Sequence, residues 1–154
     1  IVRKDLVGKD PANTPIYLDY KTHAEKGSMY NTPPCYSIYV AGEVFKYLLA
    51  TGGVAAMHEK DVRKAKKIYD CLDESEFFKG TVAKEDRSLM NVTFVTPSPE
   101  LDKKFVAGAK ERGMINLKGH RIVGGYRASI YNAFPEEGVD KLIEYMKEFE
   151  AENK

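Results

Sequence analysis

The segment Lys118–Ala133, with the sequence KGHRIVGGYRASIYNA, supplies the last β elements of the predicted domain. Ile122-Val123 and Ala128-Ser129-Ile130 are short apolar pieces that flank Gly124-Gly125. Apolar pieces on either side of a glycine pair predict two strands or a hairpin-like bend. A small sheet is therefore expected to end here, ahead of the last predicted helix.

Hydrophobic spacing and turn signals predict the elements outside this segment. Residues 89–95 alternate between apolar and polar, as in a strand with two different faces. Ser98 is the expected N-cap of a helix that has Pro99 at its first position and Gly113 as its stop. The predicted fold class is α/β, with a short mixed sheet that includes a β-α-β unit and packs against helices. The expected order is helix 34–51, helix 54–72, strand 89–95, helix 99–112, strand 114–117, the bend, and a helix from residue 136.

The first two predicted helices differ in polarity. In 34–51 only Glu43 and Lys46 are charged, so this helix is expected to be buried on more than one side, at an interface with another domain or subunit. In 54–72 the expected apolar stripe includes Val62, and the basic residues around Lys64 are expected to face solvent.

Residues 1–33 are rich in glycine, proline and asparagine, which argues against regular structure. An arm of this length is expected to be disordered or shaped by contacts with a missing domain or a second subunit. Thr32 is a candidate N-cap, with Pro33 as the first residue of the following helix. Asn31 and Thr32 also offer an amide and a hydroxyl on a backbone stiffened by two prolines.

Composition limits the classes of function. The chain has 154 residues, 43% hydrophobic and 31% charged, which fits one globular domain of ordinary size. A net charge of +1 gives no electrostatic case for nucleic acid or an anionic membrane, and no apolar run is long enough to span a bilayer. Cys35 and Cys71 are expected to be free thiols in a reducing compartment. No histidine has metal-ligand spacing, so no metal site is expected. Because the chain begins at Ile1 without a methionine, we expect residues upstream.

The charges of the opening segment are strongly one-sided. From Arg112 to Pro135 there are four Lys or Arg and no Asp or Glu, although the whole chain has 24 basic and 23 acidic residues. Two arginine forks in one small region suit phosphate or carboxylate, since a planar guanidinium can bind two oxygens at once. From the residues alone, two interpretations stay open: a pocket for a small anion, built around Lys118, His120, Arg121 and Arg127, or a solvated basic loop.

Four motifs give the chain a resemblance to a known family. They are NTPP at 31–34, GGV at 52–54, RSLMNVTF at 87–94, and the long run from Asn116 to Glu150 that contains KGHRIVGGYRASIYNA. Together they resemble the phosphoserine aminotransferases, which are pyridoxal-phosphate enzymes of fold type I. The resemblance implies that residues 1–33 are the end of a large domain and an irregular arm. Residues 34–154 would be the C-terminal small domain, including the connecting helix.

The resemblance also implies roles for particular residues. His120 with Arg121 would hold the phosphate or distal carboxylate of the substrate, and Arg127 its α-carboxylate. Asn31 and Thr32 would reach the cofactor phosphate of the other subunit in a homodimer. The implied reaction is the transamination of glutamate and 3-phosphohydroxypyruvate to phosphoserine and 2-oxoglutarate, in the cytoplasm, for serine biosynthesis.

The same resemblance implies that the Schiff-base lysine lies upstream of this chain. We therefore expect the 154 residues alone to be inactive and to bind pyridoxal phosphate weakly at most. The alternative is a stand-alone, non-catalytic module that binds anions or dimerises through helix 34–51.

Overall fold

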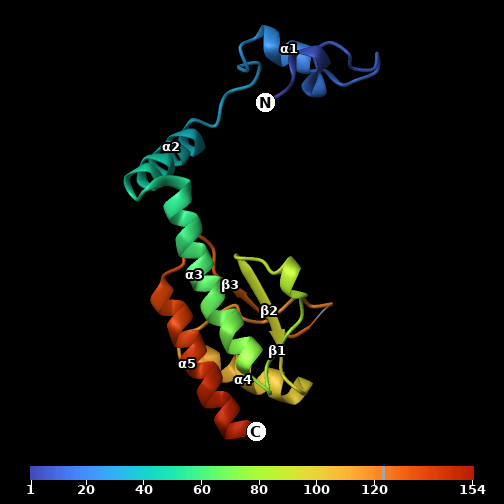
Figure 1. Ribbon diagram of the computed structural model, residues 1–154. Coiled ribbons are helices and arrows are strands. Elements are labelled where there is room, and N and C mark those ends of the chain that lie inside the picture. The colour runs from blue at the N-terminus through green and yellow to red at the C-terminus, as the bar shows by residue number, and fades with distance from the viewer. Residues whose placement is uncertain (123) are drawn as a thin grey trace. The chain divides into compact units, whose positions relative to one another are not determined.

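A computed structural model describes residues 1–122 and 124–154 of the chain (Figure 1). Val123, which belongs to one of the predicted apolar pieces, lies outside the described residues. The chain forms two compact units, Ile1–Tyr47 and Leu48–Lys154, and each is described by itself. The boundary between the two units falls within the helix Cys35–Ala50. The domain boundary that the sequence predicted, between residues 33 and 34, stays a prediction. The helices are α1 (Tyr20–Glu25), α2 (Cys35–Ala50), α3 (Gly53–Glu74), α4 (Pro99–Glu111) and α5 (Glu136–Asn153), and the strands are β1 (Lys79–Gly80), β2 (Asn91–Val95) and β3 (Tyr126–Ser129).

The arm contains more regular structure than the sequence predicted. Two 3-10 turns, Lys4–Leu6 and Ile16–Leu18, precede α1. The side chain of Asp19 caps α1 by accepting hydrogen bonds from the backbone N–H groups of Lys21 and Thr22 at 2.8 and 3.2 Å. A helix of six residues is too short to show an apolar repeat, so the cap was its only signal.

The predicted start of α2 was one or two residues too early. The helix begins at Cys35, and Ile38 N–H donates to Pro34 O at 3.1 Å. Thr32 and Pro33 are not helical. Pro33 precedes another proline, and steric clash with a following proline ring keeps a residue out of the helical region.

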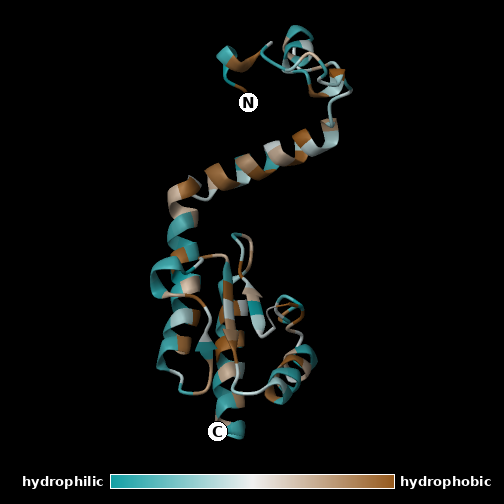
Figure 2. Cartoon of the chain, turned by 90° about the vertical axis from the view of Figure 1, so that its right-hand side faces the viewer, coloured by the Kyte–Doolittle hydropathy of each residue, from teal (hydrophilic) through white to brown (hydrophobic). Residues whose placement is uncertain are grey.

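Figure 2 shows several hydrophobic residues and few hydrophilic ones along α2. None of its residues is buried, and Tyr36 is 80% and Leu49 77% exposed. The predicted end of this helix before Gly52-Gly53 is confirmed. The predicted interface between this helix and another domain or subunit stays a prediction.

The sheet of the second unit is antiparallel, in the order β1-β2-β3. In the register, Val92 faces Ala128 and Thr93 faces Arg127. The predicted mixed sheet with a β-α-β unit was wrong, because 114–117 is not a strand. Asn116 has a φ of 62°, a left-handed conformation that interrupts an extended run. The α/β fold class is confirmed, and β1, with two residues, gave no signal in the sequence.

One face of the sheet forms the core. Its buried side chains include Val92, Phe94, Tyr126 and Ala128, all of them 2% exposed or less. Helices α3 and α5 lie side by side (Figure 1), and Phe105 of α4 packs against the rings of Phe94 and Tyr126. The predicted N-cap at Ser98 is confirmed, since its hydroxyl accepts from Leu101 N–H at 3.4 Å.

The other sheet face carries Asn91, Thr93, Arg127 and Ser129, which are half-buried or exposed. These residues are thus more exposed than the side chains of the core face. Among the described residues no helix is long and apolar enough to cross a membrane.

Two residues of α3 have the opposite solvent exposure to the one predicted. Val62, placed in the apolar stripe, is 38% exposed, whereas Lys64, placed in solvent, is completely buried. A lysine has a long apolar stem, so it can occupy a core position if its amine finds polar partners.

Candidate functional site

The segment after α4 runs along the edge of β3 that β2 leaves open. Arg127 N–H donates to Leu117 O at 2.8 Å, and Lys118 forms an isolated antiparallel bridge with Tyr126. Gly119 N–H donates to Gly125 O at 2.8 Å. The predicted strand around Ala128 is therefore confirmed as β3, and Ile122 lies in the turn that precedes it.

Two glycines let the backbone close on itself at this turn. A Cβ atom on Gly119 would lie 2.2 Å from Gly124 O and 2.8 Å from Gly125 O. A Cβ atom on Gly125 would lie 2.6 Å from Phe94 O, and Gly125 has a φ of 59°. The sequence predicted a bend at Gly124-Gly125, and the geometry shows that the close approach of the backbone requires glycine at positions 119 and 125.

A hollow of about 800 Å³ lies beside β3, between the 112–118 segment and α5. Its apolar wall includes Leu117, Ile130 and Leu142, and its polar groups include Ser129. Four cationic residues line it, and no Asp or Glu is among its described lining residues. The cations are Arg112, Lys118, Arg127 and Lys141.

Arg127 and Arg121 differ from the other arginines of the chain. Of the six arginines, four form an ion pair with a carboxylate: Arg3, Arg63, Arg87 and Arg112. In the described part of the chain no carboxylate lies within ion-pair distance of Arg121 or Arg127. Both are exposed, so their guanidinium groups are available to an external anion.

Arg112 has a structural task in the wall of the hollow. Its guanidinium donates to Glu148 at 3.2 Å and lies 4.4 Å from the centre of the Tyr145 ring. Lys118 and Lys141 are exposed and form no ion pair with any residue that the structure describes. The cations available to a ligand in the hollow are therefore Arg127, Lys118 and Lys141.

The structure does not bring all predicted site residues into this hollow. Arg127 and Lys118 line it, whereas His120 and Arg121 are exposed in the turn before β3. Nδ1 of His120 accepts from Ile122 N–H at 3.3 Å. Asn31 and Thr32 belong to the other compact unit, where both are exposed.

Lys64 was missed as a site residue because its neighbours in the sequence are basic and exposed. Its amine donates to the carbonyl oxygens of Ile130, Tyr131 and Phe134 at 3.0, 2.8 and 3.3 Å. All three of these residues also line the hollow. No signal in the sequence pairs α3 with residues so far along the chain.

Beneath the site, Tyr126 and Thr96 form a buried polar contact. Burial raises the pKa of the Tyr126 phenol far above its ordinary value, and the phenol donates to Thr96 Oγ1 at 3.4 Å. Thr96 in turn donates to Asp102 at 2.6 Å. Tyr126 therefore stays protonated at neutral pH and is not a candidate general base. Across the described residues, no group of three or more His, Cys, Asp or Glu is placed to hold a metal.

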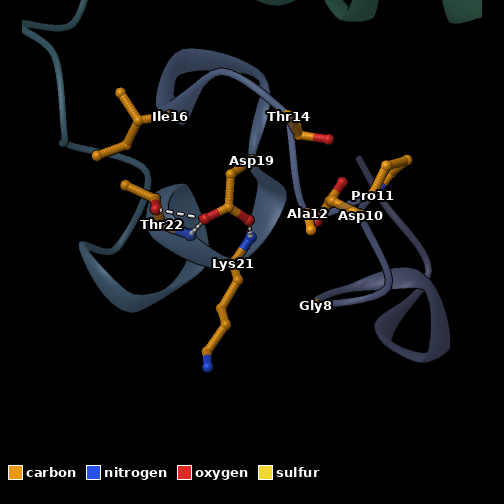
Figure 3. Close-up of a pocket in the computed structure, with 9 residues that line it drawn as sticks. All are labelled: Gly8, Asp10, Pro11, Ala12, Thr14, Ile16, Asp19, Lys21 and Thr22. Carbon is orange, nitrogen blue, oxygen red and sulfur yellow. Dashed lines mark hydrogen bonds between the residues drawn. The ribbon is translucent and has the colours of Figure 1, made fainter.

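A second hollow, of about 370 Å³, lies within the first unit (Figure 3). Asp10 and Asp19 line it, and Asp19 accepts the two capping hydrogen bonds of α1. The hydrogen bond from the Thr22 hydroxyl is the main cause that lowers the pKa of Asp19. Lys21 also lines this hollow, and its amine lies 3.9 Å from the carboxylate oxygen Oε1 of Glu25. With two carboxylates in its lining, this hollow is not suited to an anion.

Comparison with known proteins identifies the class of the chain. The model of the aminotransferase class-V family matches residues 6–142. The chain therefore belongs to the class-V aminotransferase family.

Within this family the chain is similar to phosphoserine aminotransferases. The one from Desulfotalea psychrophila is 54% identical over 153 residues, which are 99% of this chain and 42% of that protein. One from Bacillus cereus is 51% identical over 154 residues, or 100% of this chain and 43% of that protein. The chain thus spans less than half the length of the curated relatives it matches.

Solved structures agree with the sequence comparison. The phosphoserine aminotransferase of Bacillus circulans subsp. alkalophilus has a TM-score of 0.92 and 43% identity, covering 99% of this chain and 43% of that one. The pyridoxal-phosphate-bound enzyme of Trichomonas vaginalis has a TM-score of 0.84 and 41% identity, covering 95% and 42%. The resemblance read from the motifs is confirmed.

Proposed function

We propose that this chain is the C-terminal, substrate-binding part of a phosphoserine aminotransferase. The whole protein would exchange an amino group between glutamate and 3-phosphohydroxypyruvate and give phosphoserine and 2-oxoglutarate. The observation that carries the proposal is the pair Arg121 and Arg127, which alone among the six arginines lack a carboxylate partner within the described residues. A substrate with an acidic group at each end needs two such free cations.

Each cation has a proposed task. Arg127 binds the α-carboxylate of the substrate, and Lys118 adds positive charge in the same hollow. His120 and Arg121 bind the phosphate or distal carboxylate. The absence of acidic residues from 112 to 135 supports this division, because a nearby carboxylate would compete with the substrate for the same guanidinium groups. Fixing both ends of the substrate orients its reacting carbon, which is the contribution of this part to catalysis.

We propose pyridoxal phosphate as the cofactor of the whole protein, where it would supply an electron sink. Asn31 and Thr32 fit its phosphate: both are exposed, and neither side chain forms a hydrogen bond with another described residue. Lys64 does not fit covalent attachment, since its amine is bonded to three carbonyl groups. Because the chain spans less than half the length of its relatives, we propose that a lysine outside these 154 residues attaches the cofactor, as the resemblance implies.

We propose that the protein acts as a homodimer in the cytoplasm, with α2 at the interface. Apolar residues exposed along α2, among them Tyr36, Phe45 and Leu49, support an interface. Both cysteines are free, as expected in a reducing compartment. The same helix supports the second candidate function, a non-catalytic module that dimerises. Light scattering on the 154-residue chain should show self-association that increases with concentration, and a strictly monomeric chain would contradict the proposed interface.

The proposed function predicts which ligands the chain binds by itself. Phosphoserine should bind with a dissociation constant on the order of 1–10 mM and shift the amide resonances of Lys118 and Arg127, whereas serine should bind far more weakly. Pyridoxal phosphate should give no stoichiometric imine absorbance. Equal affinity for serine and phosphoserine would contradict the anion site, and an imine signal abolished by replacing one lysine would contradict the assignment of the attachment lysine.

A further inference from the structure

We propose that Lys64 is a positioning residue, which holds the wall of the substrate hollow in place from inside the core. The inference deepens the proposed function and rests on it. Lys64 belongs to α3, is completely buried, and touches neither the hollow nor an exposed surface. Its role therefore depends on the residues that it binds.

The partners of Lys64 account for all its donors. A lysine amine has three N–H donors and no acceptor. The three carbonyl groups of Ile130, Tyr131 and Phe134 take all of them. The carboxylate of Asp61, 3.1 Å away and 4% exposed, provides a buried opposite charge.

These hydrogen bonds hold residues 130–134, which follow β3, close to the amine of Lys64. Tyr131 O accepts from Lys64 and also from Phe134 N–H at 2.8 Å, which closes a tight turn. On its other side, Ile130 N–H donates to Met90 O at 2.8 Å. The end of β3 is thus held between β2 and the amine of Lys64.

This held segment is also the wall of the hollow. Ile130, Tyr131 and Phe134 line the same hollow as Arg127, and Ile130 follows Arg127 by three residues. The hydrogen bond to Ile130 O is buried, and a buried carbonyl group that loses its partner is costly, so the segment would rearrange without Lys64. A shift of this wall moves Arg127 relative to the other cations, and small displacements of a binding group have large effects.

The test compares Lys64→Met with Lys66→Met. Lys66 is on the same helix, but its amine is exposed and pairs with Asp70, so this control removes a lysine without touching the wall. Phosphoserine affinity is measured by NMR on the full chain, at a temperature where each variant is folded. We expect about tenfold weaker binding for Lys64→Met and unchanged binding for Lys66→Met. A purely structural lysine would lower the unfolding temperature and leave the affinity of the folded protein unchanged, which would overturn the inference.

Hydrogen exchange provides a readout that needs no ligand. In Lys64→Met the amides from 130 to 134 should lose protection while those of α4 keep it. Uniform loss across the unit would overturn the inference. If Lys64→Met does not fold, Lys64→Gln, which retains two donors, should show the same local loss at a smaller amplitude. Absence of phosphoserine binding by the unaltered chain would contradict the proposed function, and exchange at 130–134 would then still decide whether Lys64 holds this wall.

Discussion

Replacing Arg127 by methionine should weaken phosphoserine binding by about 10- to 100-fold. A hydrogen bond to a charged group contributes about 1.5–3 kcal/mol, which corresponds to roughly 10- to 100-fold in affinity. Because Arg127 is exposed and has no carboxylate partner in the described part of the chain, its removal should leave the fold intact. Titration of the full chain followed by NMR or calorimetry measures the change.

Two variants make this prediction specific. Arg63→Met removes the same charge from an arginine that pairs with Glu136 at 3.6 Å, away from the hollow, and it should leave affinity unchanged. Arg127→Lys keeps the charge but loses the planar guanidinium. Its affinity for phosphoserine should therefore lie between the affinities of Arg63→Met and Arg127→Met. Binding that is unaffected by Arg127→Met, or equally reduced by Arg63→Met, would show that general positive charge rather than this site attracts the ligand.

Replacing Gly125 by alanine should lower the free energy of unfolding by about 2–4 kcal/mol. Two costs add up at this position. The φ of 59° is unfavourable for a residue with a side chain, and the new Cβ atom would lie 2.6 Å from Phe94 O. Phe94 is in the central strand and cannot retreat without breaking the register with β3. Urea denaturation followed by circular dichroism measures the change.

Gly124 is the matched control for this substitution. Its φ is 79°, but a Cβ atom would meet nothing within 4 Å, so Gly124→Ala carries only the conformational cost of about 1 kcal/mol. The difference between the two variants isolates the close approach to Phe94. Equal destabilisation would mean that the turn relaxes away from β2.

Much of the fold was predictable because patterns of neighbouring residues indicate where helices and strands begin and end. Residues 89–95 alternate, and β2 formed there with Val92 and Phe94 buried. Ser98 followed by Pro99 placed the start of α4, and Gly52-Gly53 the end of α2. Each of these signals depends on residues a few positions apart, so a sequence read in windows contains them.

Two predictions were wrong because the sequence near a residue did not decide its structure. Residues 114–117 looked like a strand, but the left-handed conformation of Asn116 interrupts it, and the sheet became antiparallel throughout. Lys64 looked like a solvent-facing residue because its neighbours are charged. Its partners are 66 to 70 residues away, and no local pattern predicts them.

The amino-acid sequence was enough to predict an anion site: it has arginines in a stretch free of acidic residues, and glycines where the chain must turn. The tertiary structure alone decided which of these cations share a hollow. Arg127 and Lys118 do, because Leu117 O binds Arg127 N–H and brings the 112–118 segment against β3. The tertiary structure also decided what holds that hollow in shape, since a buried amine can satisfy three distant carbonyl groups only after α3 has packed against the end of β3.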